Sequence, residues 1–477
     1  MRMVWKRLLI SERMVEYGEK KAGSPDLRNE FEKDYHRIIG SSSFRRLQDK
    51  TQVFALDKSD FIRTRLTHSL EVSSFARSLG QNIAEHILEN GLDPGFTIRE
   101  KAQICDILQC AGLIHDIGNP PFGHFGEEAI RDWFQRKLPV LTFKGKPIAE
   151  CLNGQMLQDL YHFEGNAQAL RQVTKLHFLV NENGMNLTIP LLNTIIKYPV
   201  SSLGMEPEGK DISKKKMGYY FAEQSLYEKI ASRTGAWHVR HPLTFILEAA
   251  DDIAYKTADI EDACKKGFLS FDKLREELLK AEKAAETGKN PESSWDPVAM
   301  LDHQFDNALK RKAVDPGLYA VQNFLVRLQS VLIFDATKGF LSHYTKIMEG
   351  SLKEDLFAGT RAQWVMDALG DIAMRYAFLS GQILSMEVSA GTILHYLMNR
   401  FVKAVIDYDT DLPLSMMNQK LIRMISDDYR EVYRLQSLKA SSEEEKLYLR
   451  LLLVTDFVSG MTDTYAKDLY QQMTGML

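Results

Sequence analysis

The stretch AGLIHDIGNPPFGHFGEEA, residues 111–129, decides what kind of protein this chain encodes. An apolar helical run ends in the adjacent pair His115 and Asp116, the backbone breaks at Gly-Asn-Pro-Pro, and His124 and Glu127 follow shortly afterwards. A hydrophobic core has no use for so many ionisable groups close together. We therefore expect a ligand-binding or catalytic site here, completed by other parts of the chain.

The surrounding sequence predicts an all-α fold. Apolar residues recur at spacings of three and four from end to end, and alternating runs of β-branched residues are scarce. The clearest helices are expected at 64–91, 97–118 and 241–267, the second of them opened by Thr97 and Glu100 in capping-box spacing. The best candidate for a small strand or hairpin is 180–190, so the sequence favours helices with at most a small β-hairpin.

The length of 477 residues allows a large core and more than one lobe. The charged segment 269–297 reads as an exposed helix followed by a loop, and it marks a soft boundary. We therefore divide the chain into a catalytic region, 1–268, and a C-terminal helical region, 269–477. The second region is expected to pack on the first, complete the pocket and supply oligomer contacts.

Composition excludes several classes of protein. With 44% hydrophobic and 26% charged residues, the chain has the make-up of a soluble globular protein, and the absence of a leader or an apolar run of about 18 residues favours the cytoplasm. The four cysteines form no CxxC pair, which argues against a thiolate zinc site. A net charge of -4 argues against a protein that coats nucleic acid, and the lysine runs at 212–218 and 309–312 are expected to be solvated loops.

Imidazole and carboxylate groups at residues 115 and 116 are natural ligands of divalent metal ions. Adjacent residues point about 100° apart on a helix, so His115 and Asp116 can meet at one ion only where the helix ends. Two partners from other helices are His68, at the head of an apolar stripe, and Asp251, inside the apolar run FILEAADDIAY. Each also has a structural interpretation, as a hydrogen-bonded core histidine or as part of a salt-bridge network.

Five sequence blocks together resemble the HD-domain phosphohydrolases, and more closely the dGTP triphosphohydrolase family within them. The blocks are RTRLTHSLEV (63–72), GLIHDIGNPPFGHFGEEAI (112–130), HFEGNAQALR (162–171), RHPLTFILEAADDIAY (240–255) and GMTDTYA (460–466). They span nearly the whole chain in family order. The resemblance implies an HD-type helical fold with additional C-terminal helices.

The resemblance also implies a reaction and a metal. Water would attack the α-phosphorus of dGTP, or of several dNTPs, and release the deoxynucleoside and intact inorganic triphosphate, an activity suited to nucleotide pool control. One divalent ion per subunit would be held by His68, His115, Asp116 and Asp251, with Mg, Mn, Co, Fe and Zn not distinguished. Cationic donors must offset phosphate charge in such a reaction, and Arg65 shares the helix face of His68.

The same resemblance assigns further site residues. His124 fits a general acid with Glu127 as its partner, although the pair could instead act as a nucleophile unit, or be a surface histidine with a first-turn glutamate. Residues matching family positions near the phosphates or the sugar are Gln52, Lys197, Tyr255 and Asp259, and Asn166 and Glu164 are expected in the pocket. Base selectivity is expected to depend on residues from the C-terminal half.

Two other interpretations remain open. The chain could be an HD nucleotidase or phosphodiesterase with a different substrate, or a non-catalytic nucleotide- or single-stranded-DNA-binding HD protein. The presence of all the expected ligands together with His124 and Glu127 argues against the second. A homo-oligomer is expected because the helix LYLRLLLVTDFVSGM (447–461) is more apolar than a peripheral helix needs, and family members differ in activation by nucleotide or single-stranded DNA.

Overall fold

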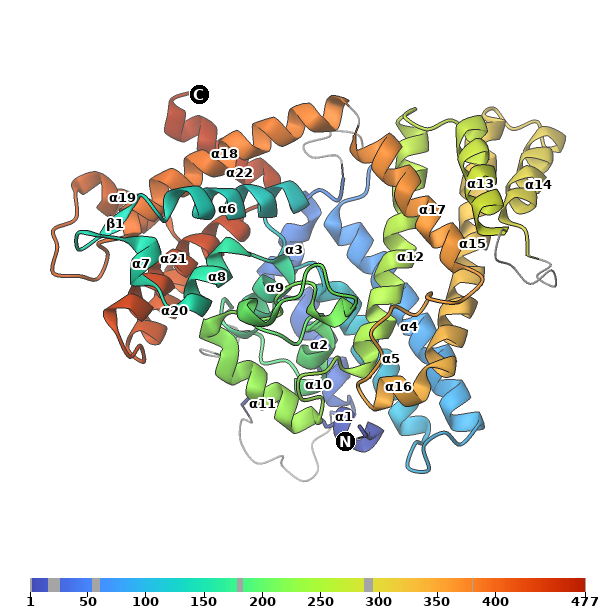
Figure 1. Ribbon diagram of the computed structural model, residues 1–477, viewed down its shortest axis with the longest axis horizontal. Helices are drawn as coiled ribbons and strands as arrows, with labels where there is room; N and C mark the ends of the chain where they lie inside the picture. Colours follow the sequence, from blue (N-terminus) through green and yellow to red (C-terminus); the bar gives the residue numbers. More distant parts are fainter. Residues whose placement is uncertain are drawn as a thin grey trace.

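The computed structural model describes residues 2–15, 26–53, 61–177, 183–286, 295–379 and 381–476. Their regular structure is almost entirely helical (Figure 1), which confirms the all-α prediction. Within these residues the one sheet is a hairpin of β1 (Thr142–Phe143) and β2 (Lys146–Pro147). The prediction of a strand or hairpin at 180–190 was wrong for 183–190, where Thr188 makes only an isolated bridge to Arg13, and 180–182 lie outside the described residues.

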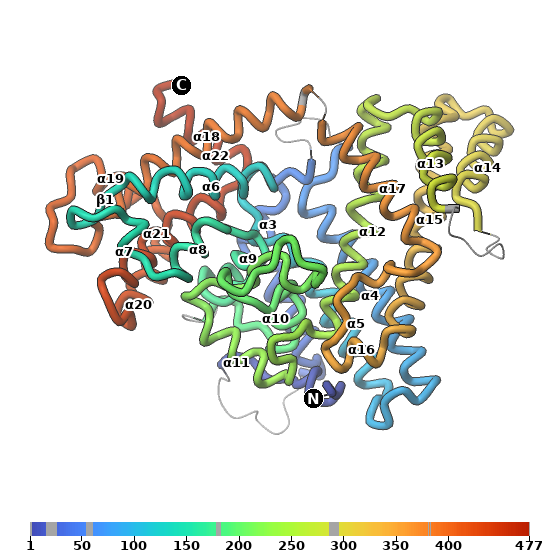
Figure 2. The backbone as a smooth tube through the Cα atoms, viewed as in Figure 1, coloured from blue at the N-terminus to red at the C-terminus, as the bar shows by residue number. Residues whose placement is uncertain are grey.

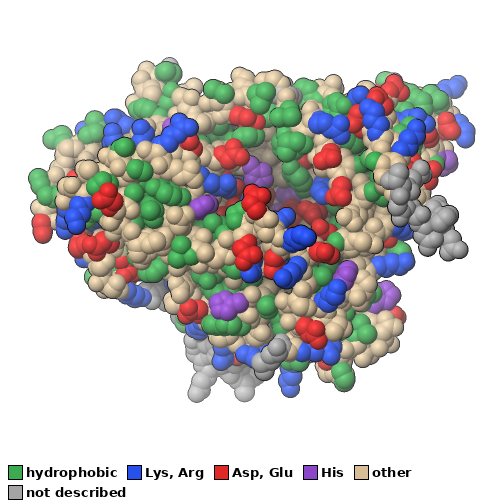
Figure 3. All heavy atoms as spheres, in the orientation of Figure 1, with side chains coloured by type: hydrophobic (Ala, Val, Ile, Leu, Met, Phe, Trp, Pro, Cys, Tyr) green, Lys and Arg blue, Asp and Glu red, His purple; other side chains and the backbone are tan. Residues whose placement is uncertain are grey.

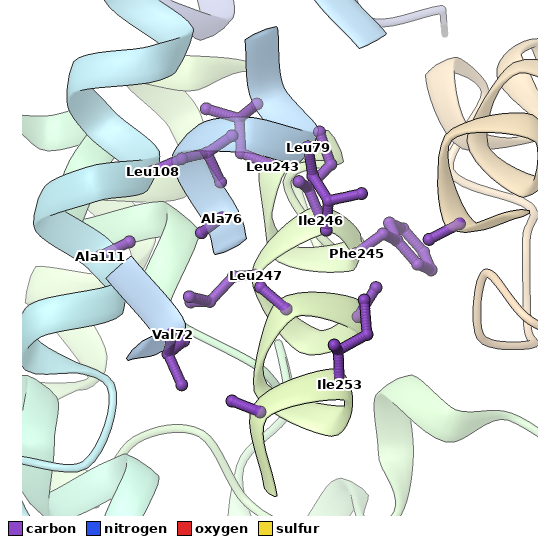
Figure 4. Close-up of a cluster of buried hydrophobic side chains, with 14 of the residues drawn as sticks. Val72, Ala76, Leu79, Leu108, Ala111, Leu243, Phe245, Ile246, Leu247 and Ile253 are labelled. Carbon is purple, nitrogen blue, oxygen red and sulfur yellow. The ribbon is translucent and has the colours of Figure 1, made fainter. Parts of the chain in front are cut away.

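The first core is built by α4 (Arg65–Glu89), α5 (Ile98–Ile114), α12 (Pro242–Lys265), α15 (Pro316–Ser342) and α17 (Gln363–Ala373). Figure 4 shows its centre, where Val72 and Leu79 of α4, Leu108 of α5 and Ile246 of α12 meet. These residues lie on the apolar helix faces that the spacing of three and four predicted. Thr97 makes the predicted capping box with Glu100 at the start of α5. The three helices expected to carry the site are thus confirmed.

The second core is built by α6 (Gly123–Lys137), α8 (Gly154–Tyr161), α18 (Gly381–Val405), α20 (Asp427–Ser437), α21 (Glu443–Ser459) and α22 (Asp463–Thr474). Figures 1 and 2 show α12 near the middle of the molecule, with α6, α18, α21 and α22 to one side and α13 (Phe271–Glu286), α14 (Pro297–Lys310) and α15 to the other. Helices that precede residue 268 in the sequence and helices that follow it contribute to each core. The division of the chain into two regions at that residue stays a prediction.

Two expectations about individual helices change. The apolar helix α21 is buried within its own chain, so its composition gives no argument for a homo-oligomer, which stays a prediction. The helix expected to be exposed, α13, packs Leu274 and Leu278 into the first core, and the loop expected after it lies largely outside the described residues.

Among the described residues, the helix α15 has the length and hydropathy of a membrane span, but one face of it packs on α4, α12 and α14.

The remaining helices all add buried residues to these two cores. They are α1 (Trp5–Leu8), α2 (Glu30–Ile39), α3 (Ser42–Arg46), α7 (Ile148–Cys151), α9 (Gly165–Thr174), α10 (Ile189–Ile195), α11 (Gln224–Thr234), α16 (Tyr344–Met348) and α19 (Met416–Met424). Between α17 and α18 the chain makes a π-helical turn over Met374–Phe378. Such turns break the regular helical hydrogen bonding and often occur at functional sites.

The buried His241 at the start of α12 makes the fold sensitive to acid. Its Nδ1 accepts a hydrogen bond from the backbone N–H of Leu243, and its Nε2 lies 3.2 Å from the Leu8 carbonyl oxygen, an arrangement that requires the neutral ring. Burial lowers the pKa of His241 to about 4. The pKa of this histidine in the unfolded chain is the ordinary value near 6.5. Between pH 6.5 and pH 4 the unfolded chain therefore binds a proton at His241 that the folded chain does not bind, so the free energy of unfolding falls as pH falls.

We expect the free energy of unfolding to lose up to roughly 3 kcal/mol through His241 as pH drops from 7 to 4. The variant His241→Asn keeps a side-chain acceptor for Leu243 and has no titrating ring, so it should lose less stability over this range. Urea unfolding of both proteins at a series of pH values measures the difference. Equal pH dependence in the two proteins would contradict this assignment.

Candidate functional site

A cavity of about 240 Å³ lies where α4, α12 and the C-terminal end of α5 meet α6 and α9. On the face drawn in Figure 3, histidine, acidic and basic side chains gather around a central hollow. Most of the residues singled out in the sequence line the cavity: Gln52, Arg65, His68, His115, Asp116, His124, Glu127, Glu164, Asn166, Lys197, Asp251 and Tyr255. Asp259 does not, because it is buried on α12 one turn beyond Tyr255.

His68, His115 and Asp251 form a compact group that could hold a metal ion. One ligand atom from each lies within 4.8 Å of the others. The Asp251 Oδ1 atom is 3.2 Å from His68 Nε2 and 3.5 Å from His115 Nε2. Asp116 lies beside this group, with its Oδ1 3.7 Å from His115 Nε2, and its carboxylate also contacts Arg65 and Asn119.

The electrostatics of this group fit a divalent cation. Burial alone would lower the pKa of His115, but Asp116 and Asp251 raise it to about 9. Burial would raise the pKa of Asp251, but the two histidines hold it well below its usual range. The His115 Nδ1 atom lies 2.8 Å from the Gly112 carbonyl oxygen, so Nε2 is the ring nitrogen that the imidazole would present to a cation on losing its second proton. Among the described atoms, that Nε2 makes no hydrogen bond.

The turn that follows His115 packs backbone against backbone on α9. A Cβ at Gly118 would lie 2.1 Å from the Ala169 nitrogen and 2.2 Å from the Gly165 carbonyl oxygen, and a Cβ at Gly165 would lie 2.1 Å from Asn119 Oδ1. No side chain fits at either position. This contact joins the HD block to the FEGNAQ block, and it explains why both carry glycine there.

His124 lies in the first turn of α6, and Glu127 follows at the start of the second turn, where its carboxylate can reach the imidazole. The His124 side chain is 65% exposed, and its Nδ1 is 3.4 Å from Glu127 Oε2. Glu127 is buried and also accepts hydrogen bonds from Arg131 (3.0 Å) and the Gly165 backbone nitrogen (2.8 Å). Burial favours its neutral form, but His124 and nearby cations lower the pKa of Glu127 to about 2, so Glu127 is negative beside the imidazole.

Three cationic groups line the same cavity as the candidate metal ligands. Lys197 pairs with Glu248 at 3.4 Å, and Arg65 pairs with Asp116, whose pKa this guanidinium lowers to about 2 against the effect of burial. Lys216 pairs with Glu164 at 3.0 Å and lines the cavity. The expectation that 212–218 is only a solvated loop was wrong at Lys216, because the path of the loop returns this lysine to α9.

A second cavity, of about 380 Å³, adjoins the first and shares Gln52, His124, Tyr255 and Phe378 with it. Its other walls are mostly apolar and come from α6, the 51–53 segment and the start of α18. Phe378, at the end of the π-helical turn, has its ring centroid 6.2 Å from that of Tyr255. The wall residues Phe378, Ile383 and Glu387 carried no signal in the sequence.

Comparison with known proteins agrees with this geometry. The HD domain family model matches residues 65–152. A deoxyguanosinetriphosphate triphosphohydrolase-like protein of Listeria monocytogenes is 43% identical over 477 residues, covering 99% of this chain and 100% of the relative. A Synechocystis protein described in the same words is 32% identical, covering 99% of this chain and 100% of the relative. A deoxyguanosinetriphosphate triphosphohydrolase of an Enterobacter species is 32% identical, covering 93% of each chain.

The family model and the HD pair coincide, since His68, His115 and Asp116 fall inside the matched residues. The relatives extend the similarity to the part of the second core that follows residue 152, which that model does not cover. The chain belongs to the deoxyguanosinetriphosphate triphosphohydrolase family of HD-domain proteins.

Proposed function

We propose that the protein is a metal-dependent triphosphohydrolase that converts dGTP into deoxyguanosine and inorganic triphosphate. Other dNTPs are substrates to the extent that they fit the site, and the activity controls the cytoplasmic nucleotide pool. The observation that carries this proposal is the meeting of His68, His115 and Asp251 with three cationic side chains in one cavity. A triphosphate needs both kinds of group, because its charge must be offset while water approaches phosphorus.

The metal would be held by His68, His115, Asp116 and Asp251. A divalent ion bound there would supply Lewis-acid charge for the α-phosphoryl group. Arg65, Lys197 and Lys216 bind the oxygens of the triphosphate, the first through a planar fork of donors and the others as point charges. Asn166, which donates a 2.7 Å hydrogen bond to Glu164, helps to hold that buried carboxylate beside Lys216.

In the reaction, the oxygen of a water molecule bonds to the α-phosphorus while the bond from phosphorus to the 5'-oxygen breaks. His124 donates a proton to that oxygen, which is otherwise a poor leaving group. Glu127 stabilises the protonated imidazole before the transfer. Both anhydride bonds stay intact, so the phosphate product is triphosphate.

The sugar and the base extend from the first cavity into the second. Gln52 and Tyr255 lie at the junction, where the deoxyribose must pass, and Asp259 behind Tyr255 keeps the phenol in place. Beyond them, Phe378 and Ile383 offer apolar contact to a planar base. The Glu387 carboxylate in the same wall can accept hydrogen bonds from the N1–H and amino group of guanine, whereas adenine presents an acceptor at N1.

Glu387→Gln is therefore expected to lower the ratio of kcat/KM for dGTP to that for dATP by about tenfold, the value of one charge-assisted hydrogen bond. The ratio is measured with both substrates at subsaturating concentration. Glu354→Gln, an exposed glutamate on neither cavity wall, is the control and should leave the ratio unchanged. An unchanged ratio in Glu387→Gln would remove Glu387 from base recognition.

The experiment that tests the proposed function identifies the phosphate products. Metal-loaded protein is incubated with each dNTP, and the products are separated by anion exchange. Triphosphate together with the free deoxynucleoside is the expected result. Orthophosphate or pyrophosphate in place of triphosphate would contradict the proposed bond cleavage and favour a nucleotidase or phosphodiesterase.

A further inference from the structure

The C-terminal block GMTDTYA, residues 460–466, contributes no side chain to either cavity. Its Asp463 begins α22 and is 1% exposed. Asp463 Oδ2 accepts hydrogen bonds from the Thr51 backbone nitrogen (3.0 Å) and hydroxyl (2.6 Å), and Oδ1 accepts one from the Phe122 backbone nitrogen (2.9 Å). One buried carboxylate thus joins three segments that are distant in sequence.

The two segments bound by Asp463 lead directly to site residues. Thr51 precedes Gln52, and Phe122 lies two residues before His124. Phe122 has φ 64°, a left-handed conformation that is unfavourable for a bulky side chain and persists only where the surroundings enforce it. The hydrogen bond from its N–H to Asp463 is one such restraint, placed at the start of the turn that presents His124.

Lys50 adds a second connection between the same three segments. Its buried ammonium group donates to the carbonyl oxygens of Asn119 and Ser459, the second at 2.7 Å, and its carbonyl oxygen accepts a hydrogen bond from the Arg65 backbone nitrogen at 2.9 Å. The HD turn is therefore tied to the end of α21 as well as to the start of α22. Both connections come from outside the cavity.

We propose that Asp463 is a positioning residue, which fixes the His124 turn and the Gln52 segment relative to each other. This inference rests on the proposed function. It gives the C-terminal block a role in turnover through the backbone of Thr51 and Phe122, without contact with the substrate. A misplacement of about 1 Å at a reacting group costs about a hundredfold in rate.

The test is Asp463→Asn in the full-length, Mn²⁺-loaded protein. Asparagine has the same shape but one acceptor oxygen, so either Phe122 or Thr51 must face an amide NH₂ group. We expect kcat for dGTP to fall by about ten- to a hundredfold, with KM and bound Mn²⁺ changed less than about twofold. Asp468→Asn on the half-exposed face of α22 is the matched control and should behave as the unaltered protein.

Amide hydrogen exchange provides a readout that does not depend on activity. Peptides covering 119–126 and 50–53 should exchange faster in Asp463→Asn, while peptides of α4 and α12 stay protected. Thr51→Val removes only the hydroxyl contact, and combining it with Asp463→Asn should add little to the loss in kcat, since both act through one contact. If the unaltered protein hydrolyses no dNTP, the proposed function fails, and the exchange result still tests the connection.

Unchanged exchange at 119–126, or a loss of Mn²⁺ in proportion to the loss of kcat, would overturn the positioning role. Unchanged kcat with increased exchange would overturn it as well, because the restraint would then have no effect on turnover.

Discussion

Asp251→Asn is expected to remove both metal binding and turnover. Asp251 Oδ1 faces the Nε2 atoms of both imidazoles, at 3.2 Å from His68 and 3.5 Å from His115, so its charge lies between the two histidines. An asparagine amide has no charge and is a weak ligand for hard divalent ions. We expect kcat/KM for dGTP to fall by about a thousandfold or more, and bound metal, measured by inductively coupled plasma mass spectrometry, to fall below about a tenth of an ion per chain.

The matched control is Asp252→Asn, next in sequence, which lines the same cavity but lies outside the ligand group. It should retain its metal. Full metal content in Asp251→Asn would show that Asp251 is not a ligand and that its approach to the histidines is a structural ion pair.

His124→Ala is expected to lower kcat for dGTP by about 10² to 10⁴-fold while leaving the metal bound. The imidazole is 65% exposed, lies outside the group of His68, His115 and Asp251, and forms its ion pair with Glu127. Its loss therefore removes the proposed proton donor and leaves the proposed metal ligands in place. Rates and metal content are measured on the same preparation, with the exposed His303→Ala on α14 as the control.

A second substrate separates the two roles open to His124. Bis(p-nitrophenyl) phosphate releases a phenolate that departs without protonation, so a general acid contributes little to its hydrolysis. His124→Ala should retain most of its rate on this ester if His124 is an acid. An equal loss on both substrates would favour the nucleophile role instead.

The sequence contains most of the information on the elements that carry the candidate metal ligands. Residues 64–91 and 241–267 have a helical apolar period, and in each a polar group interrupts that period, at His68 and Asp251. Interruptions of this kind are visible because burying an unpartnered charge is costly. The hairpin at 142–147 was missed because it pairs only two residues on each strand, too few for an alternating pattern to emerge.

Other site residues could not be found in this way. Lys216 lies in an irregular loop whose return to Glu164 depends on tertiary packing, and its sequence neighbours are also lysines. Phe378 lies in the π-helical turn and Glu387 on α18, and both line the second cavity because of how these segments pack, which their local sequence does not indicate. Asp463 resembles an ordinary residue in the first turn of a helix, because its partners belong to residues more than 300 positions away.

The division into two cores has a practical consequence for how the enzyme would lose activity. The candidate metal ligands lie on helices of the first core, whereas His124 lies on α6, whose buried face belongs to the second. Partial melting of α18, α21 and α22 would release α6 from its packing partners before it disturbed the imidazoles and Asp251. Inactivation by heat is therefore expected to precede both the release of metal and the loss of most helical circular dichroism. A preparation could then pass the usual checks of folding and metal content and still be inactive.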